Sequence, residues 1–387
     1  MSRSVHRLRE FGETVFATMS ARAVEFDAVN LGQGFPDSDG PPRMLEIACE
    51  EIRAGNNQYG PGRGLPVLRE AVAAQRARDH GVHYDPDTEV LITVGATEAI
   101  SAAVLGLVEP GTEVIVLEPY YDAYAAAIAL AGARRVAVPL AADGATWTVD
   151  VAAVRAAITA DTAMLIINSP HNPTGAVFSR ATLSELAKVC VEHDLLVLSD
   201  EVYENLLFDA LPHTAVASLP GMRERTVTVS SAAKSYNVTG WKTGWALAPA
   251  PLLDAVVTAK QFMSYVGATP FQPAVAHALT HEGPWLSAMV AELATGRDIL
   301  VDGLRSAGLS VHDTHGTYFV IADIGEGRDG LDFCLELPAR IGVAAIPVQV
   351  FCDDPGPWRS KVRFAFGKKH ETLHRGVERL QLLDECP

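Results

Sequence analysis

Hydrophobic and polar positions follow two periods along this chain, and segments of the two kinds alternate. Short runs rich in β-branched residues predict strands at 90–94, 114–117, 135–138, 163–168, 195–199, 226–229 and 241–249. Longer stretches with helical spacing predict helices at 42–54, 66–79, 97–108, 122–131, 180–193 and 251–266. Strands and helices in alternation are typical of a mostly parallel sheet with helices on both faces, so the pattern predicts an α/β fold.

The pattern changes in the last third of the chain. Further helix is predicted to about residue 308, followed by separate strands at 318–321, 343–346 and 362–366 with helices between them. This favours a second, smaller α+β domain at 276–387, beside a large domain at 31–275. Residues 1–28 have the scattered apolar positions of a helical arm, and we expect an arm at 1–30 to be part of the small domain.

The composition is that of a folded protein, with 48% hydrophobic and 20% charged residues among 387. A formal net charge of −16 disfavours nucleic acid and anionic membranes as main partners, but it allows a small anionic ligand at a local positive site. The apolar stretch at 123–133 is too short to span a bilayer, and residues 1–12 lack the apolar segment of a secretory signal. We therefore expect a cytoplasmic protein.

The cysteines and histidines predict neither disulfides nor a metal site. His80 and His83 are three positions apart, but no H-E-x-x-H motif or cysteine set accompanies them, so an exposed surface pair is expected. The five cysteines form no C-x-x-C pair, which favours free thiols. These cysteines are Cys49, Cys190, Cys334, Cys352 and Cys386.

The strongest chemical signal is a single lysine among small residues. The predicted strand 226–229 leads directly into the segment S-S-A-A-K at 230–234, which ends at Lys234. An amine held among Ser and Ala at a strand end is partly desolvated, which favours the neutral, nucleophilic form. The chemistry that fits is an imine with an aldehyde, above all with pyridoxal 5′-phosphate (PLP). A lysine that reaches solvent from a loop is the alternative that this segment alone leaves open.

Other polar residues follow predicted strands, at the sheet edge where ligands of α/β proteins bind. Gly95, Ala96 and Thr97 follow strand 90–94 and open a helix, which is the geometry that binds a phosphate, and Thr97 can also cap that helix. Asp200 follows strand 195–199 and is expected to be partly buried, so it needs a cationic partner such as a protonated pyridine nitrogen. A helix cap is the alternative for Asp200.

Loops supply further candidates. Asn172 is fixed by the prolines and glycine of its loop at 169–175, and Tyr120 and Tyr121 follow strand 114–117, where either ring could cover a flat heterocycle. The glycines and proline at 29–37 indicate a loop whose backbone lies close to another group. In strand 362–366 the alternation turns Arg363 away from the apolar face, and a solvated strand arginine is the alternative.

Together and in this order, the motifs resemble class I aminotransferases of PLP fold type I, along essentially the whole chain. The most specific are N-P-T-G at 172–175, D-E-V-Y at 200–203, and S-A-A-K at 231–234 with T-G-W-K at 239–242. The segment L-G-Q-G-F-P-D at 31–37 is similar to kynurenine/glutamine and methionine aminotransferases and to actinobacterial N-succinyldiaminopimelate aminotransferases. The resemblance implies a large PLP-binding domain with a mostly parallel seven-stranded sheet flanked by helices, plus the smaller α+β domain.

The resemblance implies that Lys234, Asp200 and Tyr203 are catalytic. Lys234 would hold PLP as an imine and then move a proton between substrate and cofactor as general base and acid. Asp200 would pair with the pyridinium N–H and keep the ring protonated. Tyr203 and Asn172 would hydrogen-bond the phenolate oxygen of the ring, and Tyr121 would stack on its face.

The resemblance also implies where the ionic groups bind. Arg363 would hold the substrate α-carboxylate, helped by Asn172 and the Gly34 backbone, with Phe16 nearby. In a homodimer, Tyr59 would reach across the interface towards the partner's phosphate and border the substrate site. The phosphate would be held by Gly95, Ala96, Thr97, Ser231 and Lys242.

The expected amino donor has a neutral side chain. Arg363 accounts for the one carboxylate that every α-amino acid carries, whereas enzymes dedicated to aspartate usually add a second arginine. An unpaired carboxylate would be costly in an uncharged aromatic pocket, but an aromatic, thioether or amide side chain would gain contacts there. A 2-oxo acid would accept the amino group. The pocket lining that the resemblance implies is aromatic and uncharged, and it consists of Phe16, Phe35, Tyr59, Tyr121 and Tyr265.

Three alternatives stay open. N-succinyl-LL-2,6-diaminopimelate has an anionic far end that would need a basic group at the pocket mouth, for which Arg63 is the candidate. A cysteine-conjugate β-lyase would use the same Lys234 and Arg363. A PLP-binding transcription regulator would need a DNA-binding domain before the fold, and the net charge of −16 disfavours it.

Overall fold

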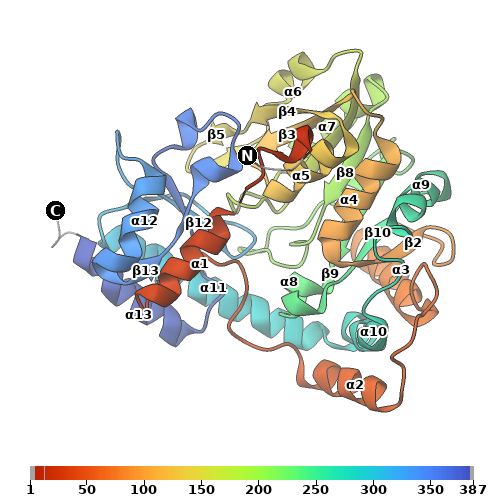
Figure 1. Cartoon of the computed structure of the whole chain (residues 1–387), viewed down its shortest axis with the longest axis horizontal. Coiled ribbons are helices and arrows are strands. Elements are labelled where there is room, and N and C mark those ends of the chain that lie inside the picture. Colours follow the sequence, from red (N-terminus) through yellow and green to blue (C-terminus); the bar gives the residue numbers. More distant parts are fainter. Residues whose placement is uncertain (1–4, 13, 384–387) are drawn as a thin grey trace.

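A seven-stranded sheet forms the centre of the computed structural model, which describes residues 5–12 and 14–383 (Figure 1). Neighbouring strands run parallel except β10, which is antiparallel to both β2 and β9. The strand order is β2 (Val90–Val94), β10 (Thr243–Leu247), β9 (Thr226–Ser231), β8 (Leu196–Asp200), β7 (Thr162–Asn168), β3 (Glu113–Glu118) and β4 (Arg134–Pro139). The predicted α/β fold with a mostly parallel seven-stranded sheet is confirmed.

Both faces of this sheet are buried, which explains why its strands are apolar throughout. In β7, Met164 and Ile166 belong to one apolar core, and Leu165 and Ile167 belong to another, as the period of two requires. The first core is completed by α4 (Gly95–Leu107), α5 (Asp122–Ala131) and α9 (Ala250–Lys260). The opposite face is covered by α6 (Val151–Ala157) and α7 (Arg180–Glu192), and near β2 by α2 (Pro42–Arg53), α3 (Pro66–His80) and α10 (Gln272–His281).

A second, four-stranded sheet carries the C-terminal part of the chain. Its order is β11 (Ser310–Val311), β12 (Phe319–Asp323), β15 (Lys361–Ala365) and β14 (Ile346–Pro347). It packs with α11 (Gly283–Ser306), α12 (Gly330–Ile341) and α13 (His370–Leu380). Figure 1 shows the N-terminal helix α1 (Val15–Glu25, red) among these blue elements, and β1 (Val29–Asn30) pairs in parallel with β13 (Val343–Ala344). The domain boundaries after residues 30 and 275 stay a prediction.

The remaining elements are short. Helix α8 (Ala232–Ser235) follows β9 directly, and β5 (Ala141–Asp143) pairs with β6 (Thr146–Thr148). Short 3₁₀ helices lie at His6–Leu8, Val216–Ser218, Thr239–Trp241, Thr269–Phe271, Val348–Phe351, Gly356–Trp358 and Gln381–Leu383. Among the described residues, no helix is long and apolar enough to cross a membrane.

The start of α4 differs from its prediction. The helix begins at Gly95 with Val94 as N-cap, so Thr97 lies inside the first turn and does not cap it. The Glu98 carboxylate accepts a hydrogen bond from the Val94 N–H at 2.6 Å and thereby stabilises the helix start. The helix begins two residues earlier than predicted. The N–H groups of Gly95, Ala96 and Thr97 are therefore in its first turn, where they have no partners within the helix.

A helix and a strand also differ from their predictions. Helix α9 ends at Lys260 and not near residue 266, and Tyr265 and Ala268 take positive φ values of 62° and 54°, which a helix excludes. The predicted strand 343–346 is divided because β13 pairs with β1 whereas β14 pairs with β15 in the other sheet. Among the cysteines, Cys49, Cys190, Cys334 and Cys352 are free thiols as predicted, and Cys386 lies outside the described residues.

Candidate active site

A cavity of about 360 Å³ lies beyond the carboxyl ends of the central strands. Arg363 reaches it from β15 and Phe16 from α1, while the other predicted residues come from the large sheet and its loops. The cavity therefore joins the two halves of the fold, as expected for a ligand site of an open α/β sheet. Its lining contains these predicted residues: Phe16, Gly34, Gly95, Ala96, Thr97, Tyr121, Asn172, Asp200, Tyr203, Ser231, Lys234, Lys242 and Arg363.

Asp200 is a buried carboxylate that faces the cavity, with 2% of its surface exposed. The Tyr124 hydroxyl donates to it at 2.6 Å and the Val202 N–H at 3.3 Å. Burial nevertheless raises the pKa of Asp200 to about 6, because these bonds and the more distant Lys234 only partly offset the desolvation. In the described part of the chain its direct partners are these neutral donors, so its charge calls for a cation from the cavity side.

Arg363 is a buried guanidinium with 2% of its surface exposed. It donates to the Asn172 side-chain oxygen at 2.9 Å and to the Gly32 carbonyl at 3.0 Å, and it lies 3.9 Å from the centre of the Phe319 ring. Burial lowers the pKa of Arg363 to about 10, and its Nε has no partner among the described residues. A buried cation with unused donors at a cavity wall is suited to an anionic group of a ligand.

The start of α4 leaves room for an anion. Gly95 has φ 71°, and a Cβ built on it would lie 3.0 Å from the ammonium of Lys242. Lys242 itself has φ 52°, which directs the chain so that its side chain returns over this helix start. Free N–H groups, the positive end of a helix and an ammonium thus meet at one place, which is the chemistry that binds a phosphate.

Lys234 and Gly34 meet on the side of the cavity that faces β12. The Lys234 ammonium donates to the Gly34 carbonyl at 3.3 Å and lies 5.7 Å from the centre of the Tyr203 ring. A Cβ on Gly34 would approach Phe319 Cζ to 2.6 Å, so only glycine brings the backbone this close. The lysine is therefore held at the cavity wall, and the solvent-directed alternative left open by its segment does not describe it.

Four residues expected near the substrate lie elsewhere in this chain. Tyr59 is 82% exposed and packs edge-on against Tyr265, whose ring centre is 5.7 Å away. Phe35 lies outside the cavity lining, where the Lys368 ammonium covers its ring at 4.7 Å. Arg63 is bound to the Asp254 carboxylate and to the Thr88 carbonyl, so within one subunit it does not border the cavity.

Comparison with known proteins decides the family. The family model described as "Aminotransferase class I and II" matches residues 27–380. The chain belongs to this family. Because class I aminotransferases depend on PLP, it is a PLP-dependent aminotransferase, as its motifs predict.

Relatives of this aminotransferase agree with the predicted subgroup. It is 53% identical to the "Probable N-succinyldiaminopimelate aminotransferase DapC" of Mycobacterium tuberculosis, over 99% of both chains. A solved structure of N-succinyldiaminopimelate aminotransferase from that organism superposes with a TM-score of 0.97 and covers 98% of this chain and 100% of its own. Methionine aminotransferase of Escherichia coli is 40% identical over 97% of both chains. Kynurenine–oxoglutarate transaminase 3 of mouse is 36% identical over 97% of this chain and 89% of its own.

The residues of the aminotransferase cavity fit PLP chemically. The carboxylate of Asp200, whose pKa burial raises, suits a protonated ring nitrogen, and Lys234 supplies an amine for covalent attachment. The cradle at Gly95 and Lys242 suits the phosphate. Because the Asn172 oxygen accepts from Arg363, its NH₂ group is left to donate to an oxygen of the ring.

Several polar lining residues escaped the sequence analysis, among them Tyr124, Asn168 and Asp122. Tyr124 donates to Asp200, and Asn168 donates to the Asp200 carbonyl at 2.9 Å while accepting from the Asn172 N–H at 2.8 Å. Asp122 also lines the cavity, so the expectation of an uncharged lining is wrong. Burial raises the pKa of Asp122, and Arg363 partly offsets this. Tyr124 could have been found from its spacing, because three positions on a helix put it on the face of Tyr121.

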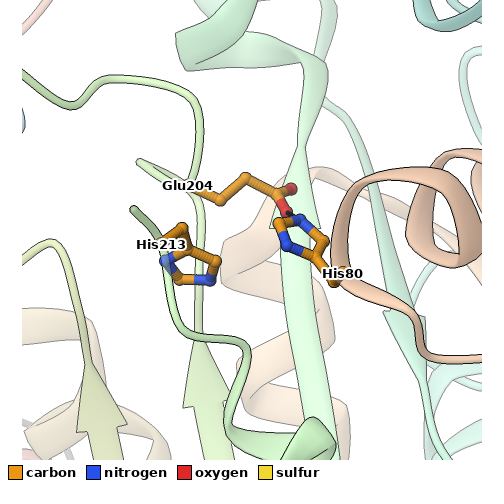
Figure 2. A group of neighbouring side chains, drawn as sticks. All are labelled: His80, Glu204 and His213. Carbon is orange, nitrogen blue, oxygen red and sulfur yellow. Dashed lines mark hydrogen bonds and ion pairs between the residues drawn. The ribbon is translucent and has the colours of Figure 1, made fainter. Parts of the chain in front are cut away.

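A second cluster of ionisable groups lies behind the turn that carries Asp200 and Tyr203. Arg76 is fully buried and donates to the carboxylates of both Glu201, at 2.6 Å, and Glu204. His80 binds Glu204 at 2.8 Å and His213 binds Glu201 at 2.9 Å. Figure 2 shows the His80 ring against the Glu204 carboxylate, with His213 close by. The predicted exposed pair is therefore wrong for His80, whose side chain is 8% exposed.

The spacing of this cluster would suit a metal ion, since donor atoms of His80, Glu204 and His213 lie within 4.8 Å of one another. However, the guanidinium of Arg76 already binds the carboxylate of Glu204 and provides its positive charge. A divalent cation would have to bind beside this guanidinium and break the histidine–carboxylate bonds. The contacts thus favour a structural ion-pair network that supports the turn at 200–204.

Proposed function

We propose that Lys234 binds PLP covalently and moves the substrate proton during transamination. When bound, PLP supplies an electron sink for the pair left at the substrate Cα. Lys234 Nζ would take the proton from the substrate Cα and would later give a proton to the cofactor carbon that is joined to the amino nitrogen. Its position at the cavity wall beside Gly34 and the Tyr203 ring supports this role.

The other cofactor contacts follow from the same cavity. Asp200 would hold a proton on the ring nitrogen, because the more distant Lys234 only partly offsets the burial of its carboxylate. Tyr203 and the Asn172 NH₂ group donate to the phenolate oxygen, and the Tyr121 ring covers the face of the cofactor. The phosphate would be held at the start of α4 by Gly95, Ala96, Thr97, Ser231 and Lys242, all of which line the cavity.

Arg363 binds the α-carboxylate of the amino acid. Its two NH groups are oriented by Asn172 and Gly32, and the Phe16 ring, 5.3 Å from its central carbon, shields it on one side. The Gly34 backbone lies beside the same place and helps to position the substrate. A carboxylate here would neutralise a buried guanidinium, which explains why binding is directed to this end of the substrate.

We further propose that the donor has a neutral side chain, aromatic, thioether or amide, and that a 2-oxo acid accepts the amino group. One observation carries this choice. Among the described residues that line the cavity, the basic ones are Lys234, Lys242 and Arg363, and each already has a role, whereas Asp122 adds a negative charge. An anionic side chain would find no counter-ion and would be repelled by Asp122.

A donor panel tests the choice. We expect kcat/KM for methionine, glutamine, kynurenine or phenylalanine to exceed that for aspartate and glutamate by at least about 10-fold, the effect of about 1.4 kcal/mol of differential binding. Asp122→Asn should narrow this ratio, because it removes the repelling charge and keeps the size of the side chain. A wild-type preference for aspartate or glutamate would contradict the proposal.

A second candidate substrate is favoured by the relatives. The 53% identical protein of Mycobacterium tuberculosis is named for N-succinyldiaminopimelate, and this substrate would place the enzyme in the synthesis of a dicarboxylic diamino acid. Its anionic end needs a basic group, and in this chain Arg63 is bound to Asp254 away from the cavity. If kcat/KM for the succinylated donor far exceeds that for every neutral amino acid, and falls in Arg63→Ala, this second candidate replaces the first.

We also infer a cytoplasmic homodimer with composite sites. Tyr59 is 82% exposed and packs against the half-exposed ring of Tyr265, so the two form an apolar surface that a partner subunit would cover. A second copy would then bring Tyr59 towards the phosphate of its neighbour. The free thiols of the chain are compatible with the reducing conditions of the cytoplasm.

A further inference from the structure

The hydroxyl of Tyr318 lies between Lys234 and Gly34. Tyr318 is 1% exposed, and its hydroxyl donates to the Gly34 carbonyl. The Lys234 ammonium donates to the Tyr318 oxygen at 2.8 Å, a shorter bond than its 3.3 Å contact with Gly34. Tyr318 is not part of the cavity lining, so it contacts the lysine from behind the wall and leaves the cavity side of Lys234 free.

The backbone before Tyr318 is held in an uncommon conformation. Thr317 is fully buried with φ 67°, a region that β-branched residues rarely adopt. Its N–H donates to the Leu206 carbonyl at 3.0 Å, and its hydroxyl accepts from the Phe319 N–H at 3.0 Å. Strain of this kind persists where the surroundings impose it, and it often accompanies a functional constraint. Here it fixes the direction in which the Tyr318 side chain leaves the chain.

We propose that Tyr318 is a positioning residue for the proton transfer performed by Lys234. The inference rests on the proposed role of Lys234. During the reaction the Nζ lone pair takes the substrate Cα proton, so the C–H bond breaks, an N–H bond forms and the electron pair stays with the substrate carbon. Nζ later gives a proton back. The lysine must therefore stay near one place while it is not covalently attached.

The Tyr318 hydroxyl can hold the lysine amine in place, which the lysine side chain cannot do by itself. Because the only hydroxyl proton of Tyr318 is used on Gly34, its oxygen is left as an acceptor for Lys234. A lysine otherwise moves freely about four side-chain bonds. The ring of Tyr318 is itself fixed by edge-on contacts with Tyr203 and Phe319, whose centres lie 5.5 and 4.8 Å away. Phenylalanine would keep these ring contacts and remove the hydroxyl, both as the acceptor for Lys234 and as the donor to Gly34.

The test compares Tyr318→Phe with Tyr236→Phe. Tyr236 is also buried, and its hydroxyl donates to the Ala278 carbonyl at 3.2 Å, away from the cavity. In single-turnover half-reactions with α-protiated and α-deuterated methionine, Tyr318→Phe should lower the rate constant about 10- to 100-fold, as misplacement of a reacting group does. The deuterium isotope effect should rise, because proton transfer becomes more rate-limiting. Tyr236→Phe should change neither quantity.

A second readout needs no bound cofactor. In cofactor-free protein, reductive methylation of Lys234, measured by mass spectrometry against exposed Lys188, should be faster in Tyr318→Phe, because the lysine loses the hydrogen bond that holds its amine at the cavity wall. Unchanged isotope effect and unchanged methylation would overturn the proposal. The proposal would also be overturned if Tyr318→Phe lost thermal stability and cofactor affinity without a change in the isotope effect, because Tyr318 would then have only a structural role. If Lys234→Ala still attaches PLP covalently, the role proposed for Lys234 fails first, and the inference about Tyr318 fails with it.

Discussion

At the scale of single residues, Asp200 has the clearest electrostatic role. Its ordinary pKa of 3.8 is raised to about 6 by burial. A raised carboxyl pKa means that the folded protein binds the proton more tightly than the unfolded chain. The stability of the cofactor-free enzyme therefore falls as pH rises through the window from about 4 to about 6, and the full cost is present at pH 7. A protonated ring nitrogen would remove this cost.

Asp200→Asn should therefore have opposite effects on the two forms of the enzyme. The substitution removes the buried charge and keeps an oxygen that can accept from Tyr124, so the cofactor-free protein should gain up to about 3 kcal/mol at pH 7. The stabilisation by added PLP and the rate of transamination should fall sharply. Thermal unfolding with and without PLP, at pH 5 and pH 7, measures both effects. A cofactor-free variant that is less stable than the wild type at pH 7 would contradict this account.

The sequence predicted the residues whose position depends on one strand. Asp200 is the last residue of β8, and Lys234 lies in α8, the helix that follows β9. Because the carboxyl ends of parallel strands meet at one edge, the proximity of the two residues followed from the pattern alone. Tyr318 was missed for the opposite reason, because it reaches Lys234 across 84 residues of sequence and no local spacing encodes that contact. Asp122 directly follows the predicted Tyr121, but the pattern marked it only as the start of a helix.

At the scale of elements, Arg76 of α3 forms ion pairs with the turn that follows β8. The carboxyl pKa values of Glu201 and Glu204 are lowered mainly by this guanidinium, with help from His213 and His80, against the effect of burial. A lowered carboxyl pKa stabilises the fold above the ordinary value near 4.5, and this contribution is lost as pH falls below it. The ion-pair network therefore stabilises the turn that presents Asp200 and Tyr203 at neutral pH.

Arg76→Met should destabilise the protein by about 3–5 kcal/mol at pH 7, because it leaves two buried carboxylates without their cation. The matched control is Arg78→Met on the same helix, whose ion pair with Asp79 is largely exposed and should be worth less than about 1 kcal/mol. Urea unfolding measures both. The difference between the variants should narrow below pH 4.5, where the carboxylates take up protons. Equal stability of the two variants at pH 7 would contradict the role of the ion-pair network.

The ends of a helix or strand were predictable where they depend only on residues nearby in the sequence. Helix α5 begins and ends where the pattern placed it, and each strand of the large sheet was found because both of its faces are apolar. The antiparallel direction of β10 and the division at β13 and β14 depend on which strand lies alongside, so the sequence did not reveal them. His80 was misjudged because Glu204, which binds its ring, comes from another part of the fold and also binds Arg76 of the same helix.

At the scale of the whole molecule, the account predicts a dimer whose active sites contain residues of both subunits. Lys234→Ala and Tyr59→Ala proteins should each be almost inactive. After mixing, unfolding and refolding together, random hybrids should recover about a quarter of wild-type activity, because half of the dimers then contain one intact site of two. Light scattering gives the oligomeric state in the same samples. A monomer, or no recovery in hybrids shown to form, would remove the composite site from the account.

The central claim is that Lys234 carries PLP in a class I aminotransferase. Borohydride treatment of the yellow protein followed by peptide mapping tests it most directly, since reduction fixes the cofactor to the lysine that binds it. The account predicts a single modified peptide that contains Lys234, and a colourless Lys234→Arg protein that incorporates no label. Label on Lys242 or on any other lysine, or an unchanged absorption spectrum in Lys234→Arg, would contradict it.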